Sequence, residues 1–195
     1  TDGAIRIGNI DIRDIKQHDL RNRIGYIPQK ATLFSGTIES NLRYADENAT
    51  DSTIENALEV SQAKEFVSKM PSGIEEPISQ GGTNVSGGQK QRLSIARALV
   101  KNADIYIFDD TFSALDYHTD ALLREALNKM VKEKHSTVFI VAQRISSIMH
   151  ADKIIVLDQG KIVGNGTHAE LMKNCPVYQE IAYSQLSRKE LAVNE

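Results

Sequence analysis

The sequence predicts an α/β domain: a parallel sheet core with helices on both faces and an inserted α-helical lobe. Strand and helix patterns alternate from residue 105 to residue 157, which indicates parallel strands joined by crossover helices. Between residues 37 and 69 the spacing of apolar residues is that of a helix, which places a small helical lobe inside the domain. With 195 residues, 41% of them hydrophobic, the chain is long enough to bury one sizeable core.

The amino-terminal residues predict a β-hairpin and one further strand. Apolar and polar residues alternate over residues 4–12 around a turn at Gly8. A second short run covers residues 24–27, Pro28 ends it, and the polar Gln29 follows directly. Gln29 therefore lies where this strand leaves the sheet.

The helical lobe follows this strand. Ser52, with Glu55 three positions later, predicts a capping box that opens one of the lobe's helices. The motifs divide the chain into a core of residues 1–29 and 101–175, a lobe of residues 30–100, and a carboxyl-terminal tail of residues 176–195.

The carboxyl-terminal half predicts alternating helices and strands. Ser86 and Gln89 form a capping box that starts a helix reaching about residue 100, and Thr167 with Glu170 opens a later helix in the same way. Residues 158–161 predict the turn of a terminal hairpin. The other expected elements are strands over residues 105–109, 137–141 and 153–157 and helices over residues 117–130, 145–149 and 177–195.

Charge and cysteine content narrow the function classes. The net charge is −3, from 23 basic and 26 acidic residues without a basic block, so we expect no nucleic-acid partner. The one cysteine, Cys175, excludes an internal disulfide and suits a buried apolar position in a reducing cytoplasm. No apolar run reaches the roughly eighteen residues that cross a bilayer, so we expect a soluble chain whose membrane link lies elsewhere.

Residues 86–92, Ser-Gly-Gly-Gln-Lys-Gln-Arg, combine a capped helix start with two glycines. Because Gly87 and Gly88 carry no side chain, an anion can approach the backbone N–H groups of the first helical turn closely. The positive end of the helix dipole adds to this attraction. The segment therefore predicts a phosphate-binding helix start.

Asp109 and Asp110 end the apolar run that begins at Ile105. They lie at the carboxyl end of an expected buried strand, where open α/β sheets place their ligands, and carboxylate oxygens suit Mg²⁺. Together with the glycine-containing helix start, they predict a site for ATP and Mg²⁺.

One common phosphate-binding pattern does not occur in these residues. The sequence contains no G-x-x-x-x-G-K-[ST], the loop whose backbone and lysine hold the β- and γ-phosphates. We therefore interpret the chain as a fragment that follows such a loop, and we expect it to be inactive by itself.

These residues resemble the nucleotide-binding domain of ATP-binding cassette (ABC) transporters, over nearly the whole chain. Residues 86–89 are similar to the family signature, residues 105–109 to the Walker B strand, residues 113–116 to the D-loop, and Gln29 to the Q-loop glutamine. Four motifs in the family's order are far more specific than any one of them. The resemblance implies a P-loop NTPase-like fold, with the amino-terminal part of the core missing from this chain.

The resemblance also implies roles for the residues around the nucleotide. Asp109 would orient the Mg²⁺ bound with ATP through water. Gln29 would also serve this Mg²⁺ site and would communicate the presence of the γ-phosphate to the helical lobe. From the residues alone, the alternative for Gln29 is an amide that finishes a strand end.

The signature and the D-loop imply a second ABC domain as partner. In the family, Ser86, Gly87, Gly88 and Gln89 would bind the ATP held by an opposing domain, and Asp116 would lie at the dimer seam. Asp116 can at the same time cap the helix that is expected to begin just after it.

Residues 33–38, Leu-Phe-Ser-Gly-Thr-Ile, resemble the exporter branch of the family. There, coupling helices of a transmembrane domain dock near the helical lobe, so the resemblance implies such a partner, the cytoplasmic face of the plasma membrane, and export of a lipophilic or drug-like compound. The alternative for Leu33 and Phe34 is packing against the lobe.

Two positions depart from the family pattern, and both concern hydrolysis. Asp110 stands where the family has a glutamate general base, and Gln143 where it has a histidine. The shorter aspartate withdraws its carboxylate by about 1.5 Å, and a misplacement of about 1 Å can cost about a hundredfold in rate. Glutamine cannot carry the positive charge of a protonated histidine. The pattern resembles the degenerate-site subunit of heterodimeric multidrug-type exporters, whose partner is a non-identical ABC domain.

Three alternatives compete with this interpretation. Chromosome-maintenance ATPases of the SMC type share the motifs, but long heptad-repeat arms separate their Q-loop from their signature, whereas 57 positions separate Gln29 from Ser86. An importer ATPase is disfavoured by residues 33–38. A non-catalytic dimerisation or regulatory module would keep the fold without hydrolysis.

Overall fold

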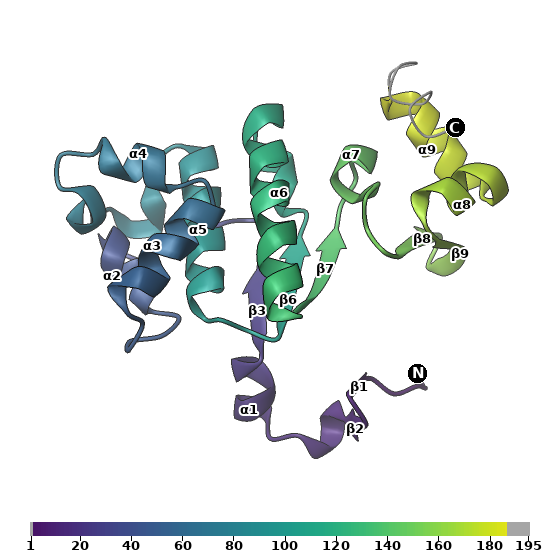
Figure 1. Ribbon diagram of the computed structural model, residues 1–195, viewed down its shortest axis with the longest axis horizontal. Helices are drawn as coiled ribbons and strands as arrows, with labels where there is room; N and C mark the ends of the chain where they lie inside the picture. Colours follow the sequence, from purple (N-terminus) through teal and green to yellow (C-terminus); the bar gives the residue numbers. More distant parts are fainter. Residues whose placement is uncertain (1, 187–195) are drawn as a thin grey trace. The chain divides into compact units, whose positions relative to one another are not determined.

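The structure is a computed structural model that describes residues 2–186 (Figure 1). Its contacts divide the chain into two units, Thr1–Val141 and Ala142–Glu195. Each unit contains its own cluster of buried apolar side chains, so each is described by itself.

The first unit combines a parallel sheet with a helical lobe. Its strands are β1 (Arg6–Ile7), β2 (Ile10–Asp11), β3 (Ile24–Ile27), β4 (Gly36–Thr37), β5 (Pro77–Ile78), β6 (Ile105–Asp109) and β7 (Thr137–Val141). Its α-helices are α1 (Gln17–Asn22), α2 (Ile38–Arg43), α3 (Asp51–Val60), α4 (Lys64–Ser68), α5 (Gly87–Val100) and α6 (Tyr117–Lys134). Short 3₁₀ helices cover Ile12–Asp14, Gly73–Glu75, Gln80–Gly82 and Thr111–Ala114.

A three-stranded parallel sheet in the order β3-β6-β7 lies at the centre of this unit, which confirms the predicted α/β class. Tyr106 and Phe108 of β6 are fully buried in a cluster shared with side chains of α5 and α6. Because successive residues of a strand point to opposite faces, the residues that alternate with Tyr106 and Phe108 along β6 face the other side of the sheet. On that side Tyr26, Phe139 and Val141 are each more than half exposed.

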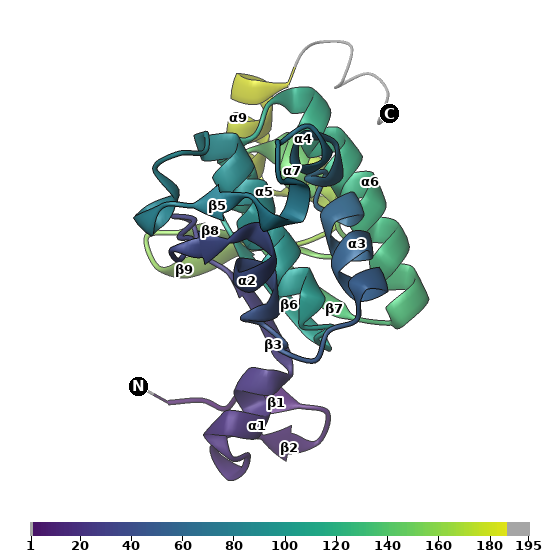
Figure 2. The same cartoon turned by 90° about the vertical axis from the view of Figure 1, so that its left-hand side faces the viewer.

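The amino-terminal hairpin is present as predicted, with β1 and β2 paired antiparallel around a turn at Gly8. In both views this hairpin and α1 project beyond the start of β3 (Figures 1 and 2). The chain then enters the sheet at Ile24, which pairs in register with Ile105 of β6.

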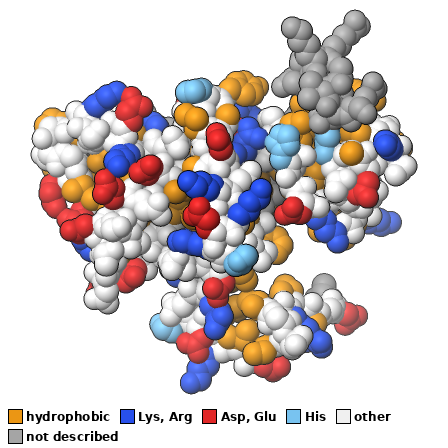
Figure 3. Space-filling view, in the orientation of Figure 1, with side chains coloured by type: hydrophobic (Ala, Val, Ile, Leu, Met, Phe, Trp, Pro, Cys, Tyr) orange, Lys and Arg blue, Asp and Glu red, His pale blue; other side chains and the backbone are white. Residues whose placement is uncertain are grey.

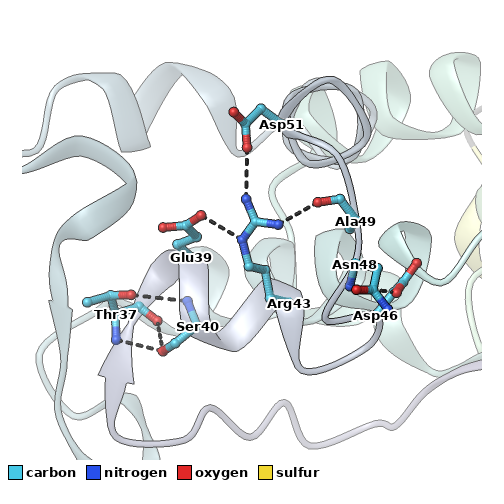
Figure 4. A network of polar contacts seen from close by, with 8 residues as sticks. All are labelled: Thr37, Glu39, Ser40, Arg43, Asp46, Asn48, Ala49 and Asp51. Atoms are coloured by element: carbon cyan, nitrogen blue, oxygen red, sulfur yellow. Dashed lines mark hydrogen bonds and ion pairs between the residues drawn. The ribbon is translucent and has the colours of Figure 1, made fainter.

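Helices α2, α3 and α4 form the predicted lobe, and α2 and α3 both contact α5. A polar network joins α2 to the start of α3 (Figure 4). Arg43 donates from Nε to Glu39 Oε1 at 2.6 Å, from Nη2 to Asp51 Oδ1 at 2.8 Å, and from Nη1 to the carbonyl oxygen of Ala49. The lobe therefore has polar cross-links in addition to its apolar core.

The predicted capping box at Ser52 and Glu55 was wrong. Helix α3 begins two residues earlier, and Thr50 is its N-cap, with Oγ1 accepting from the N–H of Thr53 at 3.2 Å. Thr50 and Ser52 are both suitable capping residues, and the pattern alone did not distinguish them.

The second unit contains α7 (Ile145–Ile148), β8 (Ile154–Asp158), β9 (Lys161–Gly166), α8 (His168–Asn174) and α9 (Pro176–Gln185). We expected β8 to continue the parallel series, but it pairs antiparallel with β9 in the predicted terminal hairpin. The turn explains this pairing, because Gln159 and Gly160 both have positive φ, 46° and 75°, as a tight two-residue hairpin turn requires. Cys175 is buried, as predicted, and residues 187–195 of the expected tail lie outside the described residues.

On the face shown in Figure 3, basic and acidic side chains are interspersed over the first unit. Helix α6, for example, carries the exposed residues Glu125, Lys129, Lys132 and Glu133. Within residues 2–186, no helix combines the length and the apolar composition that a membrane crossing requires.

Candidate nucleotide-binding site

The carboxyl ends of β3 and β6 bring four polar side chains together. Nε2 of Gln29 donates to Oδ2 of Asp110 at 3.2 Å, and the hydroxyl of Tyr26 donates to Oδ2 of Asp109 at 3.0 Å. The two strands are parallel neighbours, so their carboxyl ends meet at the same edge of the sheet. The structure thus places the predicted residues Gln29, Asp109 and Asp110 in one cluster.

The backbone of Asp110 is unusual for a residue with a side chain. It adopts the left-handed conformation, with φ 44° and ψ 32°, which aspartate tolerates better than most residues. Its N–H donates to the carbonyl oxygen of Val141 at 2.9 Å, so the turn is tied to the end of β7. The next residue, Thr111, is buried and donates from Oγ1 to the carbonyl oxygen of Ile27 at 3.3 Å. Both neighbouring strands therefore anchor the position of Asp110.

The donor set at this edge suits Mg²⁺ that arrives with a nucleotide. Carboxylate oxygens of Asp109 and an amide oxygen of Gln29 are hard ligands, and Mg²⁺ characteristically uses one or two carboxylates together with phosphate oxygens and water. No group of three or more His, Cys, Asp or Glu residues in the described part of the chain could hold a metal ion. Asp109 and Gln29 thus fit a shared metal–phosphate site better than a complete protein cage.

The hydrogen bond from Tyr26 also affects the tyrosine. The interaction with Asp109 raises the pKa of the Tyr26 phenol above its usual value, with burial and the negative charge of Asp109 adding to the effect. The phenol is therefore protonated at neutral pH and acts as the donor, since the carboxylate can only accept.

The predicted capping box at the start of α5 is confirmed. Oγ of Ser86 accepts from the N–H of Gln89 at 3.2 Å, and Oε1 of Gln89 accepts from the N–H of Ser86 at 2.9 Å. Ser86 and Gly87 are exposed, and no atom of another part of the chain lies within 4 Å of the place where a Cβ on Gly87 would be. The first turn of α5 is therefore open to an incoming anion.

The signature and the D-loop lie close together. A Cβ on Gly88 would lie 3.8 Å from the carbonyl oxygen of Ala114, the last residue of the 3₁₀ helix that follows Asp110. Asp116 caps α6 and accepts from the N–H and Oγ1 of Thr119 at 2.9 and 2.7 Å. The bond from the Thr119 N–H has the larger effect, and together the two bonds hold the pKa of Asp116 below its ordinary value. Asp116 thus caps α6, and the residue is exposed.

Gln143 belongs to the second unit, whereas Asp110 belongs to the first. The side chain of Gln143 is exposed, and its carbonyl oxygen accepts from Nε2 of Gln185 at 2.8 Å. This bond ties the segment before α7 to the end of α9.

Sequence reasoning did not identify Tyr26 as part of this region, and it assigned no individual contact to Arg92, the last residue of the segment 86–92. Tyr26 pairs in register with Ile107, so it shares a face of the sheet with Asp109, two residues further along β6. Arg92 donates from Nη1 to the carbonyl oxygen of Gln62 at 2.8 Å, and burial lowers the pKa of its guanidinium. Identifying Tyr26 as a site residue requires the register of β3 against β6, which the sequence pattern does not contain.

A parallel sheet with two carboxylates at its edge and an open, glycine-containing helix start define a nucleotide-binding α/β domain. The family described as ABC transporter matches residues 1–113, more than half of the chain, and the chain belongs to this family.

Known proteins of this family resemble the chain over almost its whole length. It is 46% identical over 188 residues to an uncharacterized ABC transporter ATP-binding protein of Mycobacterium tuberculosis, covering 95% of this chain and 32% of the relative. It is 42% identical over 187 residues to the ABC transporter ATP-binding protein YfiB of Bacillus subtilis, covering 96% of this chain and 32% of that protein. The chain therefore spans about a third of the length of these curated relatives.

A solved structure gives the same result for the fold. A bacterial Atm1-family ABC exporter with ATP bound superimposes with a TM-score of 0.90 and 34% identity, covering 96% of this chain and 33% of the exporter chain. The predicted resemblance to the nucleotide-binding domain of an ABC exporter is confirmed, and so is the P-loop NTPase-like fold class.

Proposed function

We propose that this chain is the ATP-binding part of an ABC exporter, which couples ATP binding and hydrolysis to the export of a lipophilic or drug-like compound. The observation that carries the proposal is the cluster at the ends of β3 and β6, where Gln29, Asp109 and Asp110 converge. The likeness to an exporter with ATP bound supports the same role for this chain.

Each residue of the cluster has a separate proposed role at the nucleotide. Asp109 and Gln29 would hold Mg²⁺, which neutralises phosphate charge when it is bound with ATP. Asp110 would accept a proton from the attacking water. Because Nε2 of Gln29 donates to Asp110, the proposed base and the proposed sensor of the γ-phosphate would be physically linked. Because the 195 residues contain no G-x-x-x-x-G-K-[ST] pattern, we expect turnover only in the full-length protein.

The site formed by this chain is proposed to hydrolyse ATP slowly. Asp110 carries a shorter side chain than the family's glutamate, and Gln143 cannot take up the positive charge that the family's histidine can. By contrast, the signature of this chain is intact, with Ser86 and Gly87 exposed. We infer that it completes the ATP site of a non-identical ABC domain in a heterodimer.

The second partner is proposed to be a transmembrane domain that docks on the lobe. Leu33 is buried, with 1% of its surface exposed, whereas Phe34 is 46% exposed. The Phe34 ring packs against that of Tyr44 with centroids 4.6 Å apart and the ring planes tilted by 44°. The guanidinium of Arg97 lies 5.3 Å from the Phe34 ring centroid. This exposed aromatic pair offers a contact for a coupling helix at the cytoplasmic face of the membrane.

The experiment that tests the proposal restores the two family residues. In the full-length transporter with its partner, Asp110→Glu and Gln143→His together should raise ATP turnover at this site by at least about tenfold, given the cost of a displaced base. The measurement is made with the partner's site inactivated at its own general base, so that the ATP turnover observed comes from this chain's site. Unchanged turnover would exclude a degenerate but repairable site and would favour the alternative, a non-catalytic dimerisation module.

A further inference from the structure

Tyr26 makes a contact with the proposed metal-binding carboxylate that the family motifs do not include. Tyr26 is 54% exposed, so burial alone does not explain its position at the end of β3. Its hydroxyl reaches from one strand to the next and donates to Oδ2 of Asp109 at 3.0 Å. Because Tyr26 pairs with Ile107, Asp109 is its diagonal neighbour on the same face, a separation that a long aromatic side chain spans.

The contact leaves the two oxygens of Asp109 in different situations. Oδ2 accepts from Tyr26, while no hydrogen bond to Oδ1 occurs within residues 2–186. A carboxylate that is held by one oxygen keeps a defined orientation and presents the other oxygen to a ligand. Mg²⁺ demands near-ideal octahedral geometry, so a fixed orientation matters more for this ion than for larger ones.

The adjacent carboxylate has a donor of its own. Gln29 lies three residues after Tyr26 in the same chain segment, and its Nε2 donates to Oδ2 of Asp110. The segment from β3 to Gln29 therefore supplies one donor to each of two consecutive aspartates, which directs the two side chains to separate partners.

We propose that Tyr26 is a positioning residue for Asp109: its hydroxyl holds Oδ2 and thereby aims Oδ1 at the Mg²⁺ that accompanies ATP. The inference rests on the proposed function and deepens it by adding a residue outside the known motifs. Partners of metal-binding carboxylates typically change metal affinity by about 10- to 100-fold when they are removed.

The test uses Mn²⁺ as a spectroscopic probe for Mg²⁺ in the full-length transporter. Tyr26→Phe removes only the hydroxyl and keeps the ring. In the presence of ATP it should weaken Mn²⁺ binding, followed by electron paramagnetic resonance, by about tenfold. With the partner's site inactivated at its own general base, the Mg²⁺ concentration that gives half-maximal turnover should rise in parallel.

Tyr183→Phe is the matched control, because Tyr183 is 61% exposed on α9 and takes no part in the site. It should leave Mn²⁺ affinity unchanged, and both variants should unfold at the parent temperature. Equal Mn²⁺ affinity in Tyr26→Phe and the parent would overturn the inference while leaving the proposed function intact. A parent that takes up no Mn²⁺ with ATP would overturn both.

Discussion

Ser86 and Gln89 hold each other through two reciprocal hydrogen bonds at the start of α5, of 2.9 and 3.2 Å. This relationship assigns Gln89 a structural role in addition to the ligand contact that the signature implies, because its side-chain oxygen is turned back to the N–H of Ser86. Gly87 and Gly88 lie between the two partners. The capping box therefore holds the glycine turn in place before any phosphate binds.

Ser86→Ala is predicted to lower the free energy of unfolding by about 1 kcal/mol, because the first turn of α5 loses its side-chain cap. Urea unfolding of the 195-residue chain measures the change. Ser72→Ala is the control, since Ser72 precedes a 3₁₀ helix without a side-chain cap hydrogen bond. Equal effects of the two substitutions would contradict a capping role for Ser86.

Gly87→Ala is predicted to separate stability from function. A Cβ at this position meets no atom within 4 Å, and alanine favours a helix more than glycine does, so unfolding should become harder by up to about 1 kcal/mol. If Gly87 makes the proposed contact with a phosphate, the same methyl group would stand in its path, so ATP-driven association of the full-length transporter should be lost. A stable variant that still associates with ATP would show that Gly87 is not a contact residue.

Gly25→Ala is predicted to destabilise the sheet. A Cβ on Gly25 would lie 2.6 Å from Cδ1 of Tyr106, and the Tyr106 ring is fully buried and cannot move aside freely. We expect a loss of about 1–3 kcal/mol in the free energy of unfolding, as for other overpacked cores. Thermal and urea unfolding measure it, with Gly87→Ala as the glycine-to-alanine control. Parent-like stability of Gly25→Ala would mean that this part of the core is loosely packed.

The second unit is predicted to weaken in acid through His168. This side chain is buried, and Nδ1 lies 2.8 Å from the hydroxyl of Tyr178, whose own pKa burial raises to about 12. Burial first, and then the charge of His150, lower the pKa of His168. The folded state thus prefers neutral imidazole. The stabilisation that neutral His168 gives the folded state is complete above about pH 6.5, the ordinary pKa of histidine in an unfolded chain. It is lost as the pH falls below that value toward the lower pKa of His168 in the folded state.

Urea unfolding at about pH 7.5 and about pH 5 measures this effect on either side of the ordinary histidine pKa. His168→Asn keeps an acceptor for Tyr178 but cannot be protonated in this range, so it should lose less stability in acid than the parent. His18→Gln, at an exposed position in α1, should behave like the parent. An identical loss in the parent and in His168→Asn would rule out His168 as the cause.

Much of the fold followed from local patterns. The capping boxes at Ser86 and Thr167 were predicted from residue types three positions apart, and both are present. The same rule failed at Ser52, because Thr50 competes for the same helix start. The terminal hairpin of β8 and β9 was predicted from its turn, whereas the expected parallel pairing of β8 was wrong, since a strand pattern does not say which neighbour a strand pairs with.

The sequence by itself determined the α/β class, the order of the elements and the identity of the motifs, because propensity, period and capping depend on residues close together in the chain. Only the tertiary structure decided that Gln29 meets Asp110 and that Tyr26 meets Asp109. These partners are more than eighty positions apart, and their contact depends on the register between β3 and β6. Register is set by the packing of buried side chains such as Tyr106 and Phe108, which no local pattern contains.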